Sequence, residues 1–171
     1  MHHKPMVLLD ERKIGEKVEE LAHRISCDYA GKELILVCIL KGAFTFAADL
    51  MRLITIPTSV EFIQASSYGS SFTSTGIVTI KRDVEVDCKG KHVLIIDTVI
   101  DSGRTMECVV DNFRRHNPAS LATVVLLNKK SRRIMNIQTT YCGFDIPDIF
   151  IVGVARAHER PHGRRLTLGT S

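Results

Sequence analysis

Long apolar runs are scarce in this sequence of 171 residues, and so are the patterns that mark a secreted protein. The longest apolar stretches, Leu34–Leu40 and residues 93–96, end well before the roughly 18 residues that indicate a membrane span. Near the beginning, the short apolar run Met6–Leu9 is followed by charge without a small-residue cleavage site. Neither a transmembrane helix nor a secretory signal is therefore expected.

Paired cysteines and clustered metal ligands are also lacking. The five cysteines include no Cys-x-x-Cys pair, and an odd number cannot pair completely within one chain. They are expected to be reduced thiols of a cytoplasmic protein, and Cys38, Cys108 and Cys142, which lie in apolar surroundings, are expected to be inert core residues. The seven histidines do not cluster as zinc ligands do.

Aromatic residues are few, with seven Phe, three Tyr and no Trp, whereas basic residues give a net charge of +4. The basic residues gather in two groups, which are Lys129, Lys130, Arg132 and Arg133, and then Arg156, Arg160, Arg164 and Arg165. Nucleic acid is one partner that such groups attract, but single-strand binders interleave aromatics with the charges. A solvated surface or a small polyanionic substrate explains the bias as well, so nucleic acid is not the favoured partner.

Hydrophobic periodicity predicts alternating helices and strands. A first helix is predicted from Ile14 to Ile25, with Asp10 as its cap and Gly31 beyond its end, and Leu34–Leu40 reads as a strand buried on both faces. Later elements are predicted as a helix at 43–53, a strand at 60–63, a loop at 66–76, a less buried β segment at 78–86, a strand at 92–98, a helix at 105–116 and a strand at 122–127. This order predicts one α/β domain with an open, mainly parallel sheet between helices, where ligands bind beyond the carboxyl ends of the strands.

The segment after the strongest strand reads DTVIDSGRT at residues 97–105, directly before a predicted helix. A strand that enters a helix through a Ser-Gly turn points backbone N–H groups and the positive helix end at one place, which predicts a phosphate site. Ser102 and Thr105 can add hydroxyl donors, and Gly103 lets the backbone come close. An ordinary helix cap with a turn glycine explains this loop, taken alone, about equally well.

This loop resembles the phosphoribosyl pyrophosphate signature of type I phosphoribosyltransferases. Further segments resemble the hypoxanthine-guanine branch of that family in the same order, namely Leu40-Lys41-Gly42-Ala43, Ser66-Ser67-Tyr68-Gly69, Leu126-Leu127-Asn128-Lys129 and residues 146–153, IPDIFIVG. The resemblance implies the type I fold, with a single domain over residues 1–171 and a small hood formed by the N-terminal and C-terminal segments. It also implies a purine salvage enzyme that joins hypoxanthine or guanine to phosphoribosyl pyrophosphate, giving IMP or GMP and pyrophosphate.

The resemblance assigns the residues that would hold the phosphoribosyl group. The 5′-phosphate would be bound by Ser102, Gly103, Arg104 and Thr105. The departing pyrophosphate would be bound by Lys41 and Gly42, and the ribose and metal region would include Asp97 and Thr98. Magnesium would bridge the pyrophosphate and the ribose hydroxyls, with Asp97 as an indirect contact.

The resemblance likewise assigns the residues that would act on the base. Asp101 would accept the N7 proton as general base, Lys129 would donate to the 6-oxo oxygen, and Phe150 and Ile151 would bind the purine ring. Ser67 and Tyr68 would belong to the loop that closes over the site. By residue type alone, Asp101 could instead be a helix cap, Lys129 part of a solvated basic patch, and Phe150 and Ile151 strand core.

Two positions depart from the family pattern. Thr98 stands where the family has a second acidic residue, and Ala157 stands where it has an Asp, so Ala157 is given no role. Glu159, Arg160 or Arg164 could replace that Asp after a local shift of the chain. An alternative function is therefore a regulatory protein of the same fold that senses nucleotide or phosphoribosyl pyrophosphate with little turnover, and a third is an RNA-binding regulator. The family is usually dimeric or tetrameric, so a homodimer or homotetramer is expected.

Overall fold

A computed structural model describes residues 6–67, 78–148, 151–152 and 168–170. The elements follow one another as β1 (Met6–Leu9), α1 (Glu11–Asp28), β2 (Leu34–Leu40), α2 (Phe44–Leu53), β3 (Thr58–Ser67), β4 (Val78–Arg82), β5 (His92–Ile100), α3 (Arg104–Arg115), β6 (Ser120–Asn128), the 3-10 helix η1 (Lys130–Arg132), β7 (Tyr141–Asp145), β8 (Ile151–Val152) and β9 (Leu168–Thr170). Within these residues no helix is long and apolar enough to span a membrane.

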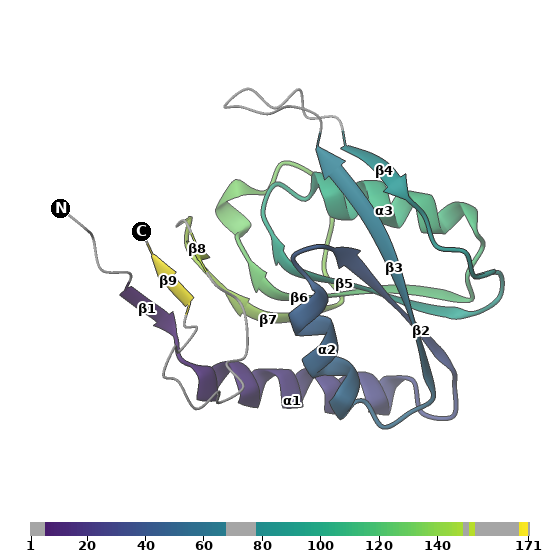
Figure 1. Cartoon of the computed structure of the whole chain (residues 1–171), viewed down its shortest axis with the longest axis horizontal. Helices are drawn as coiled ribbons and strands as arrows, with labels where there is room; N and C mark the ends of the chain where they lie inside the picture. Colours follow the sequence, from purple (N-terminus) through teal and green to yellow (C-terminus); the bar gives the residue numbers. More distant parts are fainter. Residues whose placement is uncertain (1–5, 68–77, 149–150, 153–167, 171) are drawn as a thin grey trace.

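The main sheet has six strands in the order β4-β3-β2-β5-β6-β7 (Figure 1). All neighbouring strands pair in parallel except β4, which runs antiparallel to β3 at one edge. The open, mainly parallel sheet predicted from the sequence is therefore confirmed. Because β2, β5, β6 and β7 are parallel, the chain leaves all four at the same edge of the sheet, and the candidate site lies there.

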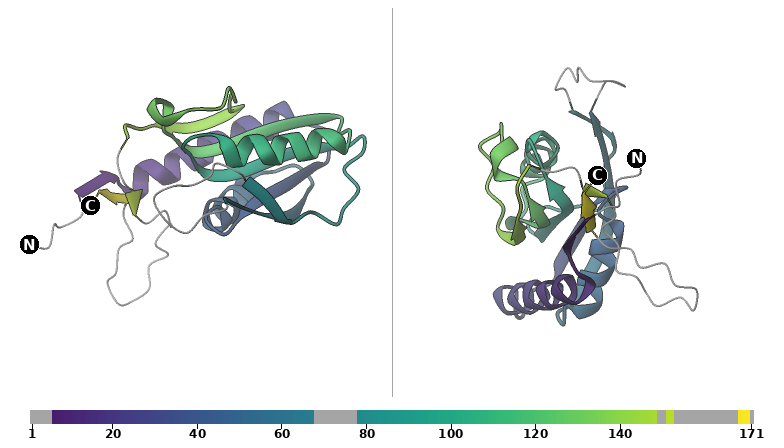
Figure 2. Two further views of the ribbon diagram at one scale, coloured as in Figure 1. Left: turned by 90° about the horizontal axis from the view of Figure 1, so that it is seen from above. Right: turned by 90° about the vertical axis from the view of Figure 1, so that its left-hand side faces the viewer.

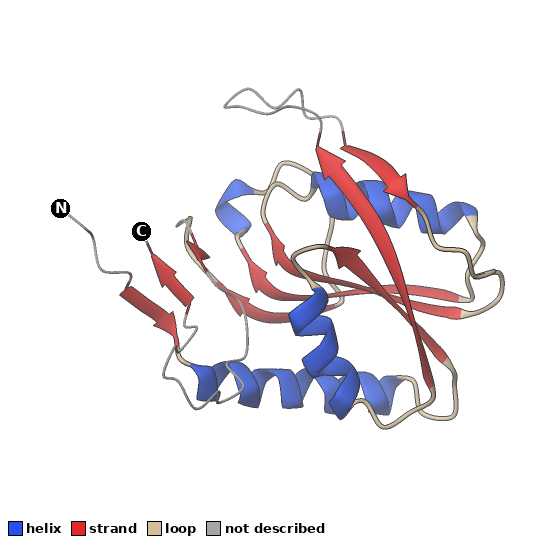
Figure 3. Cartoon of the chain, in the orientation of Figure 1, coloured by secondary structure: helices blue, strands red, loops and turns tan. Residues whose placement is uncertain are grey.

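Helices cover both faces of the sheet, with α1 and α2 on one side and α3 on the other (Figures 2 and 3). Alternate residues of β2 enter two separate cores. Leu34, Leu36 and Cys38 pack with α1 and α2, whereas Ile35, Val37 and Ile39 pack with α3. This double burial explains why the strand is continuously apolar, as its sequence predicted. The predicted cap of the first helix is also confirmed, because the Asp10 carboxylate accepts from the Lys13 N–H at 2.8 Å.

Two strands extend further than the sequence predicted. Strand β5 continues to Ile100, so residues 97–100 of the DTVIDSGRT segment are strand, residues 101–103 form the turn, and α3 begins at Arg104. Strand β3 continues to Ser67, so Ser66 and Ser67 are not loop residues as predicted, because they pair with Thr79 and Val78 of β4. The rest of the predicted loop, including Tyr68, lies outside the described residues.

A second sheet, with the order β1-β9-β8, joins the beginning of the chain to its end. Strand β9 pairs antiparallel with both β1 and β8. In Figure 1 this sheet lies to one side of the main sheet, next to the start of α1. The described parts of the N-terminal and C-terminal segments therefore share a small second sheet, while the assignment of those segments to a hood stays a prediction.

Candidate functional site

A tight turn joins β5 to α3 at the carboxyl edge of the sheet. Gly103 is the N-cap of α3 and has a φ of 89°, which disfavours any residue with a side chain. A Cβ at this position would also lie 3.0 Å from both Arg133 Cδ and Ile137 Cγ2. Because the N-cap is a glycine, it has no side chain that could cap α3, and the Arg104 N–H makes only a long contact of 3.5 Å with the Ser102 hydroxyl, so the positive end of the helix is open to a ligand.

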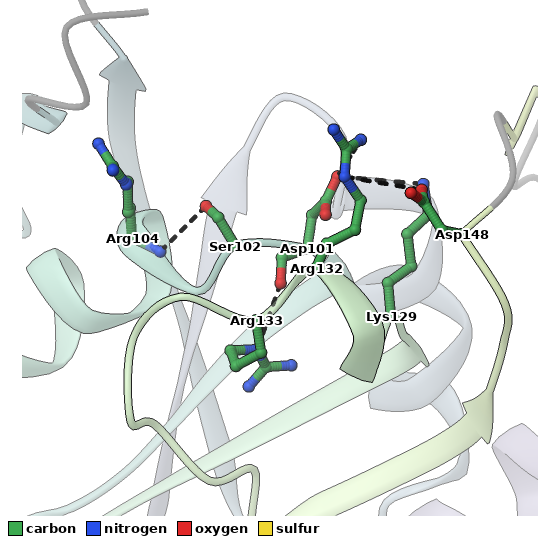
Figure 4. A network of polar contacts seen from close by, with 7 residues as sticks. All are labelled: Asp101, Ser102, Arg104, Lys129, Arg132, Arg133 and Asp148. Atoms are coloured by element: carbon green, nitrogen blue, oxygen red, sulfur yellow. Dashed lines mark hydrogen bonds and ion pairs between the residues drawn. The ribbon is translucent and has the colours of Figure 1, made fainter.

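A small cavity at this turn is lined by Asp97, Val99, Ile100, Asp101, Ser102, Gly103, Thr105 and Met106. Three of the four residues expected to bind phosphate therefore line one cavity. The exception is Arg104, whose side chain points away from Asp101 and Lys129 (Figure 4). Its backbone N–H approaches the Ser102 hydroxyl at 3.5 Å. The turn thus provides backbone and hydroxyl donors around a space at a helix N-terminus, as a phosphate site requires.

The loop after β6 holds this turn in place through hydrogen bonds to its carbonyl groups. The Ser102 carbonyl accepts from the N–H groups of Ile134 and Met135 at 3.0 and 3.1 Å. Arg133 donates from Nε to the Asp101 carbonyl at 3.2 Å, and its other nitrogens donate to the Asn128 side chain and the Ile137 carbonyl. The sequence placed Arg133 in a solvated basic group, so this structural role was missed. Its position just after a buried strand that ends at the ligand-binding edge was the available signal.

The Asp101 carboxylate is not a helix cap. Its Oδ1 atom is buried and has no hydrogen-bond partner among the described residues, while Oδ2 lies 3.5 Å from Arg132 and 4.0 Å from Lys129 Nζ (Figure 4). A carboxylate oxygen buried in this way is stabilised when a ligand or an ordered water donates to it. The site therefore presents an acceptor that a donor of a bound molecule can satisfy.

Lys129 differs from the basic residues beside it. Its side chain is only 9% exposed, compared with 72% for Lys130, and its backbone N–H donates to the Ile100 carbonyl at 3.0 Å. A solvated patch describes Lys130 but not Lys129. Arg132 lies between Asp101 and Asp148, 3.6 Å from the latter, and so brings the segment after β7 to the same site (Figure 4).

The turn between β2 and α2 contains the exposed residues Lys41 and Gly42. The peptide bond Leu40–Lys41 is cis. Gly42 does not have a positive φ, and a Cβ there would meet no atom within 4 Å, so neither strain nor packing requires glycine. A bare backbone at this place leaves room for a ligand to approach. The buried Thr98 donates from its hydroxyl to the Gly42 carbonyl at 3.0 Å, so its hydroxyl faces this turn.

Asp97 precedes Thr98 on β5, and burial raises the pKa of its carboxyl to about 7. Hydrogen bonds from the backbone N–H groups of Thr98 and Val99 oppose this rise without cancelling it. The described residues contain no group of three or more His, Cys, Asp or Glu side chains that could hold a metal on its own. Magnesium is commonly held by one or two carboxylates together with substrate phosphates, and Asp97, which lines the cavity at the phosphate turn, is a carboxylate of that kind.

Several expected site residues can be placed only in part. Phe150 lies outside the described residues, as do Ala157, Glu159, Arg160 and Arg164. Ile151 begins β8, where its backbone pairs with Thr170, and Ser67 ends β3. The five cysteines are all free, and burial raises the pKa of Cys38 to about 11 and also raises those of Cys108 and Cys142. Cys38 is buried as a core residue is expected to be, whereas Cys108 and Cys142 are only half-buried.

The fold and the turn at the start of α3 together define an α/β protein of the class in which ligands bind beyond the carboxyl ends of parallel strands. Comparison with known proteins narrows this class. The model of the phosphoribosyl transferase domain family matches residues 7–159, so the chain belongs to the phosphoribosyltransferase family.

Relatives of known sequence and structure agree with this assignment. A hypoxanthine-guanine phosphoribosyltransferase of Dictyostelium discoideum is 43% identical over 151 residues, covering 86% of this chain and 84% of the relative. A hypoxanthine phosphoribosyltransferase of Escherichia coli is 41% identical over 155 residues, with 90% and 87% covered. The crystal structure of a hypoxanthine-guanine phosphoribosyltransferase of Bacillus anthracis superposes with a TM-score of 0.84 at 37% identity, with 99% of each chain covered. The fold is therefore that of the type I phosphoribosyltransferases.

Proposed function

We propose that this chain transfers the 5-phosphoribosyl group of phosphoribosyl pyrophosphate to hypoxanthine or guanine, giving IMP or GMP and pyrophosphate in purine salvage. The observation that carries the proposal is the Asp101 carboxylate at the phosphate turn: its buried Oδ1 has no partner among the described residues, and its Oδ2 lies 4.0 Å from Nζ of the buried Lys129. The relatives support the same substrates, because they are named as enzymes of hypoxanthine or of hypoxanthine and guanine.

Asp101 and Lys129 act on the purine in this proposal. As N9 of the base attacks the anomeric carbon of the ribose, the Asp101 carboxylate accepts the proton from N7, and Lys129 donates to the 6-oxo oxygen. Positioned general bases typically contribute about a hundred-fold to ten-thousand-fold in rate. Phe150 and Ile151 are proposed to contact the purine ring, as the resemblance implies.

The phosphoribosyl group is held from two sides. Ser102, Gly103 and Thr105 bind the 5′-phosphate at the start of α3, with Arg104 in the same turn, and Lys41 with Gly42 binds the departing pyrophosphate. Loss of the pyrophosphate builds positive charge on the ribose, so rate acceleration comes from orientation, stabilisation of the leaving group and exclusion of water. Ser67 and Tyr68 are proposed to belong to the segment that excludes water. Bound magnesium would neutralise the pyrophosphate, and Asp97 is proposed as an indirect contact to it.

The substrate assignment predicts which bases are used. With magnesium and phosphoribosyl pyrophosphate, hypoxanthine or guanine should be converted to its monophosphate, whereas adenine should not, because Lys129 needs an acceptor at position 6. Chromatographic separation of the nucleotides formed from each base is the measurement. Efficient adenine turnover without hypoxanthine turnover would overturn the assignment. Absence of turnover with all bases, despite tight nucleotide binding, would favour the regulatory alternative, which the named relatives do not support.

Replacing Lys41 tests the assignment of the pyrophosphate turn. Lys41→Ala should raise the KM for phosphoribosyl pyrophosphate by about ten-fold and leave that for the purine within about two-fold, because one charge-assisted contact is lost on one substrate only. Steady-state kinetics with each substrate varied in turn measure the difference. Lys89→Ala is the matched control, since Lys89 is an exposed lysine on the turn before β5, at the other end of that strand. Equal effects on both substrates would remove Lys41 from the pyrophosphate site.

The remaining expectations also stay proposals for this chain. A single domain over residues 1–171, a homodimer or homotetramer, and a cytoplasmic location are proposed from the family resemblance and the free cysteines. Nucleic acid and membrane are not proposed as partners, because a polyanionic substrate accounts for the basic residues that the structure places near Asp101.

A further inference from the structure

Thr98 links the two halves of the site that bind the phosphoribosyl group. It is 5% exposed at the end of β5, and its hydroxyl donates to the Gly42 carbonyl at 3.0 Å, across 56 positions of sequence. Three residues later the same strand delivers the Asp101 turn and the phosphate cavity. The contact therefore ties the turn assigned to pyrophosphate to the strand that carries the turn assigned to phosphate.

In the turn at 41–43, Lys41 and Gly42 are exposed, whereas Ala43 is fully buried in the core. The Ala43 N–H donates to the Ile39 carbonyl of β2, and the Phe44 N–H donates to the Lys41 carbonyl. Among the hydrogen bonds of the described residues, that from Thr98 is the one which joins the Gly42 carbonyl to another element. Because the hydroxyl fixes this carbonyl, it also fixes the direction of the peptide groups beside it.

A hydroxyl can make this contact and an ionised carboxylate cannot. A Thr hydroxyl donates to a carbonyl, whereas the carboxylate of Asp or Glu only accepts and would be repelled by the carbonyl oxygen. Thr98 can therefore hold the turn through its hydroxyl, which an acidic residue at this position could not do by the same contact.

We propose that Thr98 is a positioning residue that holds the 41–43 turn in the orientation which binds pyrophosphate, and that its hydroxyl does not contact the ribose. This inference rests on the proposed function, because it takes the turn as the pyrophosphate site. It assigns to Thr98 a contribution to leaving-group binding made through Gly42. Ligands that lack the pyrophosphate should not depend on it.

The test compares two ligands, pyrophosphate and IMP, which occupy different parts of the proposed site. Pyrophosphate probes the 41–43 turn, while IMP carries the ribose hydroxyls and the 5′-phosphate but no pyrophosphate. Isothermal titration with magnesium present should be done on the full chain and on Thr98→Val, which keeps the shape of the side chain and removes the hydroxyl. We expect the Kd for pyrophosphate to rise by about ten-fold, the factor that corresponds to one lost hydrogen bond of ~1.4 kcal/mol, and the Kd for IMP to stay within about two-fold.

Two further variants separate positioning from general loss of stability. Thr98→Ser keeps the hydroxyl and should bind pyrophosphate as the unmodified chain does. Thr123→Val is the matched control, because Thr123 is equally buried at 5% and its hydroxyl accepts from the Thr140 N–H at 3.1 Å, away from the turn. It should lose stability without losing affinity for pyrophosphate. Thr98→Ala supplies the same test if the Val variant does not fold.

Each outcome decides the proposal. The inference would be overturned if Thr98→Val and Thr98→Ala bound pyrophosphate as tightly as the unmodified chain does. It would also be overturned if Thr98→Ser bound pyrophosphate as weakly as the Val variant. Weaker binding of IMP to the same extent as pyrophosphate would instead place the hydroxyl at the ribose. If the unmodified chain bound neither ligand, the proposed function itself would fail, whatever the variants did.

Discussion

Replacing Asp101 by Asn should lower turnover with hypoxanthine and with guanine by about a hundred-fold or more. The amide keeps the size of the side chain but cannot take the N7 proton. Its carbonyl oxygen can still accept from Arg132, which lies 3.5 Å from Oδ2. Binding of IMP should stay within a few-fold, because the phosphate turn rests on backbone contacts of Ser102 and on Arg133 and not on this carboxylate.

Stability separates this expectation from a structural role. Since the Asp101 carboxylate contacts Arg132 and Lys129 and no N–H group of α3, loss of its charge should not unfold the helix, and the melting temperature should stay close to that of the unmodified chain. Steady-state kinetics, IMP titration and thermal melting on the same preparation make the comparison. Asp111→Asn is the control, because its half-exposed carboxylate lies on α3 and pairs with Arg114 at the surface. Near-normal turnover in a folded Asp101→Asn variant would remove Asp101 from the mechanism.

The fold could be predicted from the sequence wherever a change in side-chain polarity coincides with the beginning or end of a helix or strand. Leu34–Leu40 was predicted with the bounds that the structure has, because a fully apolar run buried on both faces is followed at once by Lys41. Polarity misled the prediction at the end of β5. Asp97 and Thr98 look like the end of a strand, yet the ladder continues, with Asp97 paired to Val125 and Val99 to Leu127 of β6. Pairing depends on a neighbouring strand that is distant in the sequence, so local composition does not reveal it.

The candidate site shows the same limit at the level of single side chains. Lys129 and Lys130 are chemically identical neighbours, but one is almost fully buried and the other mostly exposed. The two lysines differ only in the direction in which their side chains point after the end of β6, and tertiary structure sets that direction. The family resemblance could nominate Lys129, whereas the roles of Thr98 and Arg133 required the contacts across the sheet edge.

Asp97 should make the protein less stable as the pH rises from about 4 to about 7. Its carboxyl has a pKa of about 7 in the folded chain, raised by burial, compared with 3.8 in an unperturbed Asp. In this window the folded state holds a proton that the unfolded state has lost, so the free energy of unfolding falls with rising pH. Well above pH 7 the ionised Asp97 destabilises the folded chain by the full amount that the pKa difference between 3.8 and about 7 implies. At 1.36 kcal/mol for each pKa unit, this is about 4 kcal/mol.

The Asp97→Asn variant removes this cost and keeps a carbonyl oxygen for the Thr98 N–H, which the carboxylate accepts at 2.7 Å. Its advantage in the free energy of unfolding over the unmodified chain should therefore grow by about 3 kcal/mol between pH 5 and pH 8. Urea unfolding at each pH, without ligand and with a chelator present, measures the difference. Asp145→Asn is the control, because the hydrogen bond from Lys130 lowers the pKa of Asp145 and its carboxylate stays ionised in both states throughout that range. Its difference from the unmodified chain should not change with pH. If the Asp97 variant behaved in the same way, the carboxyl would already be ionised in the folded protein at pH 5, and burial would not hold its proton.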